Sequence, residues 1–242
     1  MYFGDYFIFM IALIACLIFS LYASAKVKTA FNKHNKTICR SGMTGSDTAE
    51  RLMRMNGVYD IGLGKTGGTL TDHYHPTKKI VNLSESTYAN ASVAAVAVAA
   101  HEIGHVMQKQ DGYWLYNLRT AVVPVANFGS FLAMPLVLIG FLLEYVLAVV
   151  DSGVGFYLAM IGVALYGASF LFALVTLPVE LDASRRAKDM LIASHILTDQ
   201  ELPAAKEVLS AAAMTYLASL LTSLVYFLRF LFYVLTLFGR RD

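Results

Sequence analysis

His101-Glu102-Ile103-Gly104-His105, preceded by the alanine- and valine-rich residues 92–100, is the stretch around which the rest of the chain is arranged. The run has helical composition, and Gly112 is suited to end the helix. Residues four apart share one helix face, so His101 and His105 can bind one metal ion. Glu102 lies about 100° around the helix, where a carboxylate can take a proton from metal-bound water. Chance produces this short pattern in roughly 1% of chains of this length, and the helical context favours a zinc site.

The composition points to a membrane protein. Hydrophobic residues make up 57% of the 242 residues and charged residues only 15%, whereas about 25% is usual for the charged share. The lipid bilayer is therefore an expected partner. A net charge of +2 and the lack of a basic stripe with interleaved aromatic residues argue against nucleic acid. Cys16 and Cys39 match neither a metal-binding pair nor a disulfide framework.

Four apolar runs are long enough to cross a bilayer, which takes about 20 helical residues. Residues 2–24 predict a retained anchor; the alternative, a cleaved signal peptide, would have a basic start and a shorter apolar core. Residues 121–150 and 154–179 predict a transmembrane hairpin, with Glu144 and Asp151 near its turn, where they can reach water. Residues 216–238 contain Arg229, so this run either spans the membrane or lies at its interface.

These runs predict a mainly α integral membrane protein with about four transmembrane helices and a small α+β zincin-like catalytic domain at the membrane surface. The expected parts are an anchor at 1–24, a cytosolic zincin-like part at 25–118, a transmembrane hairpin at 119–179, a cytosolic helical segment at 180–214 and a transmembrane or interfacial helix with its tail at 215–242. Sixteen of the 19 Lys and Arg residues lie in residues 25–120 and 180–214, which the positive-inside tendency places in the cytoplasm. Arg240 and Arg241 would then end outside, which argues against a full crossing by the last run.

The part before the metal-binding helix predicts short local elements. Residues 44–56 predict a capped helix, and residues 58–63 and 79–83 predict strands. A strand just before the metal-binding helix could form the edge along which an extended peptide substrate lies, through Lys79, Ile80, Val81 and Asn82. A structural hairpin explains the same residues equally well. His73 and His75 lie between the strands and are expected at the rim of the site in preference to ligand positions.

A catalytic zinc needs a third protein ligand from the same side of the membrane. The candidates in the chain are Glu180, Asp182, Asp189, His195, Glu201 and Glu207. Glu180 is favoured because its helix face carries the small residues Ala183, Ser184 and Ala187, and the face of the histidine helix is similarly small. Two such faces would let the helices approach closely. The alternative is a carboxylate that only stabilises the first turn of a helix.

The His-Glu-x-x-His helix, a preceding Asp-His-Tyr segment and Val179-Glu180-Leu181-Asp182-Ala183-Ser184-Arg185-Arg186-Ala187 after a hairpin resemble the YugP-like family of bacterial membrane proteins, described as neutral zinc metallopeptidases. The layout is also similar to HtpX-type membrane zincins. The resemblance implies that His101, His105 and Glu180 bind one Zn²⁺ ion and that Glu102 is the general base. In glutamate-type zincins an aspartate four residues after the glutamate orients the first histidine. This chain has Ser184 there, whereas Asp182 would point elsewhere.

The expected function is a zinc endopeptidase of the bacterial inner membrane, with its catalytic side cytoplasmic and a protein or peptide as substrate. The candidates to support a metal ligand or to stabilise the oxyanion are Ser184, Tyr216, His73 and Arg185. A site-2-type intramembrane protease is disfavoured, because the apolar run before His101 is too short to cross a bilayer. The alternative is a non-catalytic zinc-binding scaffold or adaptor, which would need a fourth ligand such as His195 or His73. The sequence does not indicate an oligomeric state.

Overall fold

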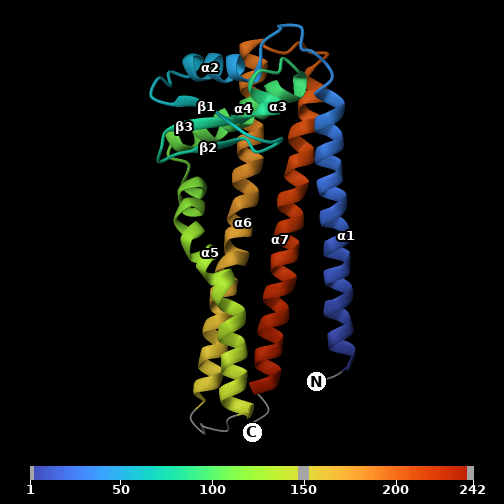
Figure 1. Cartoon of the computed structure of the whole chain (residues 1–242), viewed down its shortest axis with the longest axis vertical. Coiled ribbons are helices and arrows are strands. Elements are labelled where there is room, and N and C mark those ends of the chain that lie inside the picture. Colours follow the sequence, from blue (N-terminus) through green and yellow to red (C-terminus); the bar gives the residue numbers. More distant parts are fainter. Residues whose placement is uncertain (1–2, 147–152, 239–242) are drawn as a thin grey trace. The chain divides into compact units, whose positions relative to one another are not determined.

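The computed structural model describes residues 3–146 and 153–238, and the chain divides into two compact units. The first, called here the helical unit, comprises Met1–Leu21, Asn117–Leu177 and Tyr216–Asp242. The second, the mixed unit, comprises Tyr22–Tyr116 and Pro178–Thr215. Four long helices supply residues to both units: α1 (Phe3–His34), α5 (Trp114–Phe141), α6 (Val154–Ser194) and α7 (Leu202–Phe238). All four can be followed in Figure 1.

The helical unit contains an antiparallel helix pair made by α5 (Trp114–Phe141) and α6. Glycines allow their backbones to approach closely, since a Cβ at Gly129 would lie 2.4 Å from the carbonyl oxygen of Leu165 and one at Gly162 would lie 2.7 Å from that of Ala133. After α5 comes a π-helix, η1 (Leu142–Val146), in which Glu144 is buried. The expectation that Glu144 reaches water was therefore wrong, because it packs against α6 at Gly155. Asp151 lies outside the described residues.

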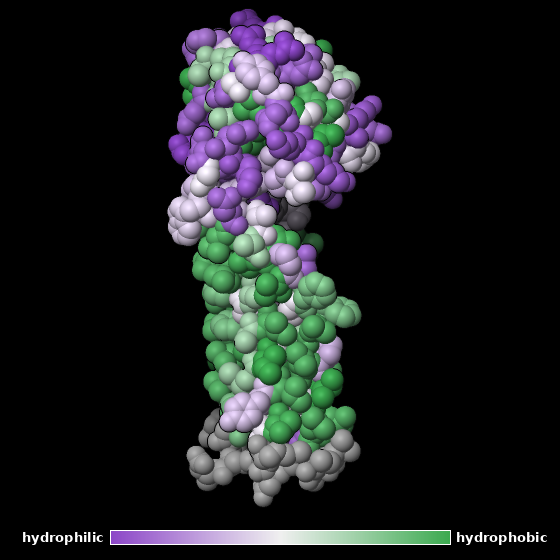
Figure 2. All heavy atoms as spheres, turned by 90° about the vertical axis from the view of Figure 1, so that its left-hand side faces the viewer, coloured by the Kyte–Doolittle hydropathy of each residue, from purple (hydrophilic) through white to green (hydrophobic). Residues whose placement is uncertain are grey.

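Three described helices are long and apolar enough to cross a membrane: Tyr6–His34, Val154–Ser194 and Leu202–Phe238. The count rises to four if Trp114–Gly129 and Phe131–Glu144, which meet at a bend of 41°, form one span. The break falls at a Gly-Ser pair, a common place for a helix to bend. On the face drawn in Figure 2, hydrophobic residues cover the helical unit and hydrophilic residues predominate over the mixed unit. The chain is a membrane protein of mostly helical structure.

Within the mixed unit, the end of α1 is followed by a capped helix, as predicted. Helix α2 (Gly45–Met55) has Thr44 as its N-cap: the Thr44 hydroxyl accepts a hydrogen bond from the Asp47 N–H, and the Asp47 carboxylate accepts one from the Thr44 N–H. This reciprocal pair is a capping box. The helix buries Leu52 and Met53 against the core of the unit.

A three-stranded sheet follows α2, with strand order β1-β3-β2. Strand β1 (Gly62–Thr66) pairs parallel with β3 (Ile80–Ser84), and β2 (His73–His75) pairs antiparallel with β3. The prediction that residues 79–82 form an edge strand was wrong, because β3 is the central strand and is paired on both sides. The strand predicted at residues 58–63 also starts too early, since Val58 and Ile61 enter the core from a loop. Hydrophobic patterning detects a strand but does not give its neighbours.

Helix α4 (Val93–Gln110) lies at the centre of the mixed unit, after the short helix α3 (Glu85–Tyr88). Its N-cap Ser92 accepts a hydrogen bond from the Ala95 N–H. The core around it draws on α2, β3, α4 and the last part of α6, through Leu52, Leu83, Val96, Ile103 and Leu191. Most of α4 is buried, so this helix is held on several sides.

Candidate metal centre

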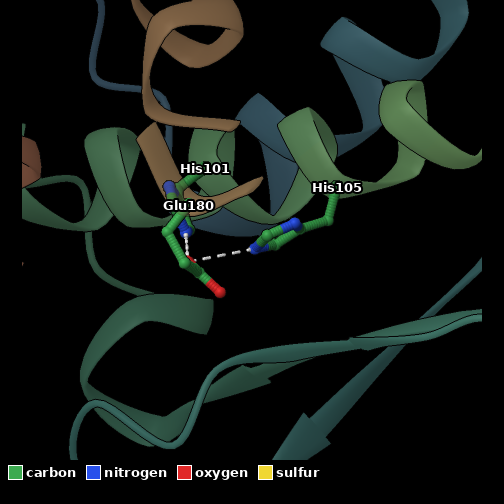
Figure 3. Close-up of side chains that lie close together, drawn as sticks. All are labelled: His101, His105 and Glu180. Carbon is green, nitrogen blue, oxygen red and sulfur yellow. Dashed lines mark hydrogen bonds and ion pairs between the residues drawn. The ribbon is translucent and has the colours of Figure 1, made fainter. Parts of the chain in front are cut away.

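Three possible metal ligands converge within the mixed unit. His101 and His105 occupy adjacent turns of α4, and Glu180 comes from α6. The Oε2 atom of Glu180 lies 3.2 Å from Nε2 of His101 and 3.4 Å from Nε2 of His105, and both rings point toward this carboxylate (Figure 3). One ligand atom from each residue lies within 4.8 Å of the others, and within residues 3–146 and 153–238 this is the only such group of three.

The two helices can meet here because their facing surfaces are small. A Cβ built on Gly104 would lie 2.5 Å from the carbonyl oxygen of Ala183, so only glycine fits without displacing α6. Ala183 and Ala187 are fully buried. This close approach lets the short side chain of Glu180 reach the two histidines, as the small faces predicted.

Each histidine is held through its other ring nitrogen. Nδ1 of His101 lies 3.2 Å from the hydroxyl of Ser184, and Nδ1 of His105 lies 2.9 Å from Oε1 of Gln108. An amide oxygen only accepts, so His105 donates from Nδ1 and its Nε2 is left with a lone pair for a metal. Ser184, four residues after Glu180, thus contacts the first histidine at the position where the resemblance places an aspartate in glutamate-type zincins. Gln108 was not predicted from the sequence, although its position three residues after His105 on the same helix could have indicated the contact.

The spacing of the donor atoms fits a zinc ion. Zinc binds histidine nitrogen and carboxylate oxygen at about 2.0–2.2 Å in tetrahedral geometry, which places neighbouring ligand atoms roughly 3.4 Å apart. The two nitrogen–oxygen distances to Glu180, 3.2 and 3.4 Å, are close to this edge length. A set of two histidines and one glutamate leaves a fourth position for water.

Glu102 is buried beside this cluster, with 6% of its surface exposed. Burial disfavours the charged carboxylate and raises the pKa of Glu102 to about 7. The negative charges of Asp72 and Glu180 add to this rise, whereas the histidines His101 and His73 oppose it. A carboxylate with such a pKa can exchange a proton near neutral pH.

The remaining predicted residues lie in several places. His73, on β2, contacts the carbonyl oxygen of Thr71 and the side-chain amide of Asn82, and it lies outside the group of three. Arg185 is exposed and pairs with Asp182 and Asp189. Tyr216 belongs to the helical unit. Asn82, Val81 and Ile80 lie in the central strand, and Lys79 precedes it.

The rejected ligand candidates have other contacts. Asp182 accepts hydrogen bonds from Gln108 and Arg186, and Asp189 pairs with Arg185. Glu201 accepts hydrogen bonds from Thr198 and from the backbone N–H of Arg40, while Glu207 binds Lys33 and His34. His195 lies in a turn at a positive φ of 51°. None of these five residues shares the group around Glu180 in the described part of the chain.

Comparison with known proteins finds a matching family and a similar protein. The model of the family described as "Putative neutral zinc metallopeptidase" matches residues 9–235. A protein of Bacillus subtilis (strain 168) named "Putative membrane protease YugP" is 41% identical over 223 residues, which cover 92% of this chain and 95% of the relative. No solved structure matches the chain.

Proposed function

Because this chain belongs to the YugP-like family of zinc metallopeptidases, we propose that it is a membrane-embedded zinc endopeptidase that hydrolyses peptide bonds of membrane-associated proteins or peptides. The observation that carries the proposal is the convergence of His101, His105 and Glu180 beside the buried Glu102. In this proposal the first three residues bind zinc through His101 Nε2, His105 Nε2 and Glu180 Oε2. The distribution of Lys and Arg supports a cytoplasmic position for residues 25–118 and 180–214.

In the proposed reaction, different side chains bind zinc and transfer the proton. When bound, zinc would polarise the scissile carbonyl, acidify a water molecule and favour the carboxylate form of Glu102. Glu102 accepts the proton of the attacking water and then passes it to the nitrogen of the leaving amine. His101 and His105 are oriented through their Nδ1 atoms, which face Ser184 and Gln108. His73, on β2, stays a candidate to stabilise the oxyanion, as the sequence suggested.

A non-catalytic zinc scaffold is the competing function. A closed structural site needs a fourth protein ligand, and the sequence offered His195 and His73 for that place. Neither belongs to the cluster around Glu180 among the residues that the structure describes. A buried glutamate that follows the first histidine of a three-ligand site favours the enzyme instead.

The Glu102→Gln variant tests the proposal. The amide has nearly the same shape as the carboxylate but cannot accept the proton, so peptide hydrolysis should fall by about 10²–10⁴-fold. Zinc content should remain that of the parent chain. The purified protein in detergent or nanodiscs would be assayed against a panel of membrane proteins and peptides, with bound zinc measured by elemental analysis.

Glu85→Gln is the matched control, because Glu85 is an exposed glutamate of α3. It should leave both hydrolysis and zinc content unchanged. Full hydrolytic activity in Glu102→Gln would remove Glu102 as the base. Zinc binding without any hydrolysis by the parent chain across the panel would favour the scaffold.

A further inference from the structure

A buried glutamine lies directly behind the metal centre. Gln108 has no exposed surface, and its side-chain amide uses both of its ends. Oε1 faces Nδ1 of His105 at 2.9 Å, while Nε2 donates to the carbonyl oxygen of Val179 at 2.7 Å and to Oδ2 of Asp182 at 3.0 Å. The side chain therefore joins the second histidine on α4 to the residues on either side of Glu180 on α6.

Asp182, which accepts the hydrogen bond from the Gln108 amide, is itself held by an ion pair with Arg186. Asp182 Oδ2 accepts a hydrogen bond from Nε of Arg186 at 2.6 Å, and Arg186 also pairs with Asp111, the C-cap of α4. The ring of Tyr113 lies 5.9 Å from the Arg186 guanidinium. Arg186 thus connects α6 back to the end of α4, and the carboxylate that receives the Gln108 amide is fixed on both sides.

The direction of these hydrogen bonds determines which end of the amide faces the histidine. Val179 O and the Asp182 carboxylate can only accept, so the NH₂ group must face them and Oε1 must face His105. Because Oε1 of Gln108 accepts a hydrogen bond, Nδ1 of His105 must carry the proton. In this Nδ1–H tautomer the lone pair of Nε2 is directed at Glu180 and the metal position. A carboxylate at position 108 would instead place negative oxygen against Val179 O and Asp182.

We infer that Gln108 is a positioning residue of the metal centre: it fixes the tautomer and ring orientation of His105 and ties them to the α6 segment that carries Glu180. The inference rests on the proposed function and deepens it, since Gln108 acts through His105 and touches neither metal nor substrate. Partners of this kind typically change metal affinity by about 10–100-fold when removed.

Gln108→Met tests this role, because methionine has a similar length and is apolar but cannot accept from Nδ1. Zinc affinity would be measured by competition with a chromophoric chelator on the full chain in detergent, and the tautomer of His105 by ¹⁵N NMR of histidine-labelled protein. We expect a loss of zinc affinity of about 10–100-fold and a His105 ring no longer held as the Nδ1–H tautomer. Gln110→Met, at an exposed glutamine of the same helix, is the control and should keep the affinity of the parent chain.

The double variant Q108E/D182N keeps the test decisive if Gln108→Met fails to fold. The carboxylate accepts from His105, and the new amide at position 182 replaces the like charge that would face it. Zinc affinity at least tenfold above that of Gln108→Met, or retained where Gln108→Met does not fold, supports the role. Parent-like zinc affinity and tautomer in a folded Gln108→Met protein would overturn it, as would a folded double variant that has lost zinc binding. A parent chain that binds no zinc would instead refute the proposed function.

Discussion

Replacing Gly104 by alanine should separate the two helices that carry the metal ligands. The added Cβ would lie 2.5 Å from the carbonyl oxygen of Ala183, 3.1 Å from its carbonyl carbon and 3.2 Å from its Cα. All three atoms are backbone, so no side chain can rotate away. Restoring a contact of 3.0–3.4 Å requires α4 and α6 to move apart by about 0.5–0.9 Å.

The size of this displacement can be compared with what a zinc site tolerates. Metal–ligand distances must hold to within about 0.2 Å, and Glu180 is only three residues from Ala183 on α6. Overpacking of this kind costs about 1–3 kcal/mol, which corresponds to roughly 5–150-fold in an equilibrium constant. Gly104→Ala should therefore weaken zinc binding by that factor, or lower the stability of the mixed unit by that free energy.

Chelator competition and thermal unfolding followed by circular dichroism, with and without zinc, would measure the two effects. Gly67→Ala is the matched control, because a Cβ at Gly67 meets no atom within 4 Å. It should leave zinc affinity and thermal stability unchanged. If Gly104→Ala binds zinc within threefold of the parent chain and unfolds at the same temperature, the helices do not meet as described and the reasoning is wrong.

Two further predictions concern the stability of the mixed unit. Burial alone would raise the pKa of Glu201, but hydrogen bonds from the backbone N–H groups of Thr198 and Arg40 hold it below its ordinary value. Because the pKa of Glu201 is lower in the folded protein, its ionised carboxylate adds to the free energy of unfolding above about pH 4.5. This contribution is lost as the pH falls through the folded-state pKa. Glu201→Gln should thus lower the unfolding temperature at pH 7, and this effect should shrink as the pH falls below about 4.5, whereas the exposed Asp199→Asn should leave the unfolding temperature unchanged throughout. An effect of Glu201→Gln that is equally large at pH 7 and at pH 3 would contradict this. Separately, Thr44→Ala removes the N-cap of α2 and should cost about 0.5–2 kcal/mol in denaturant unfolding, and an unchanged midpoint would show that the cap contributes nothing.

Spacing along the chain was sufficient to find the histidine helix, because residues four apart on a helix always share a face. The choice of Glu180 depended on a second local property, the small residues on its helix face, and the structure brings that face against Gly104. The spacing of the two histidines and the small residues beside Glu180 are each properties of a single helix. Because helix geometry is regular, the positions of these residues in space can be predicted from their spacing in the sequence.

Strand order and the contacts of Gln108 could not be obtained in this way. The pattern of residues 79–83 indicates a strand equally well at an edge or in the centre, and only the pairing with β1 and β2 distinguishes the two. Asp182 was expected to point away from His101, and it does, but its role as the acceptor for Gln108 depends on rotamers in two different helices. Ser184 was a candidate from the sequence to support a metal ligand or the oxyanion, and its hydroxyl lies 3.2 Å from Nδ1 of His101.

The distance in sequence between the metal ligands has a consequence for how the protein is made. His101 and Glu180 are 79 residues apart, so at 5–20 residues per second a ribosome needs roughly 4–16 s to pass from one to the other. During that interval the nascent chain holds the histidine pair and Glu102 but lacks the carboxylate from α6. The proposed hydrolytic centre is therefore incomplete until α6 has been synthesised and has packed at Gly104.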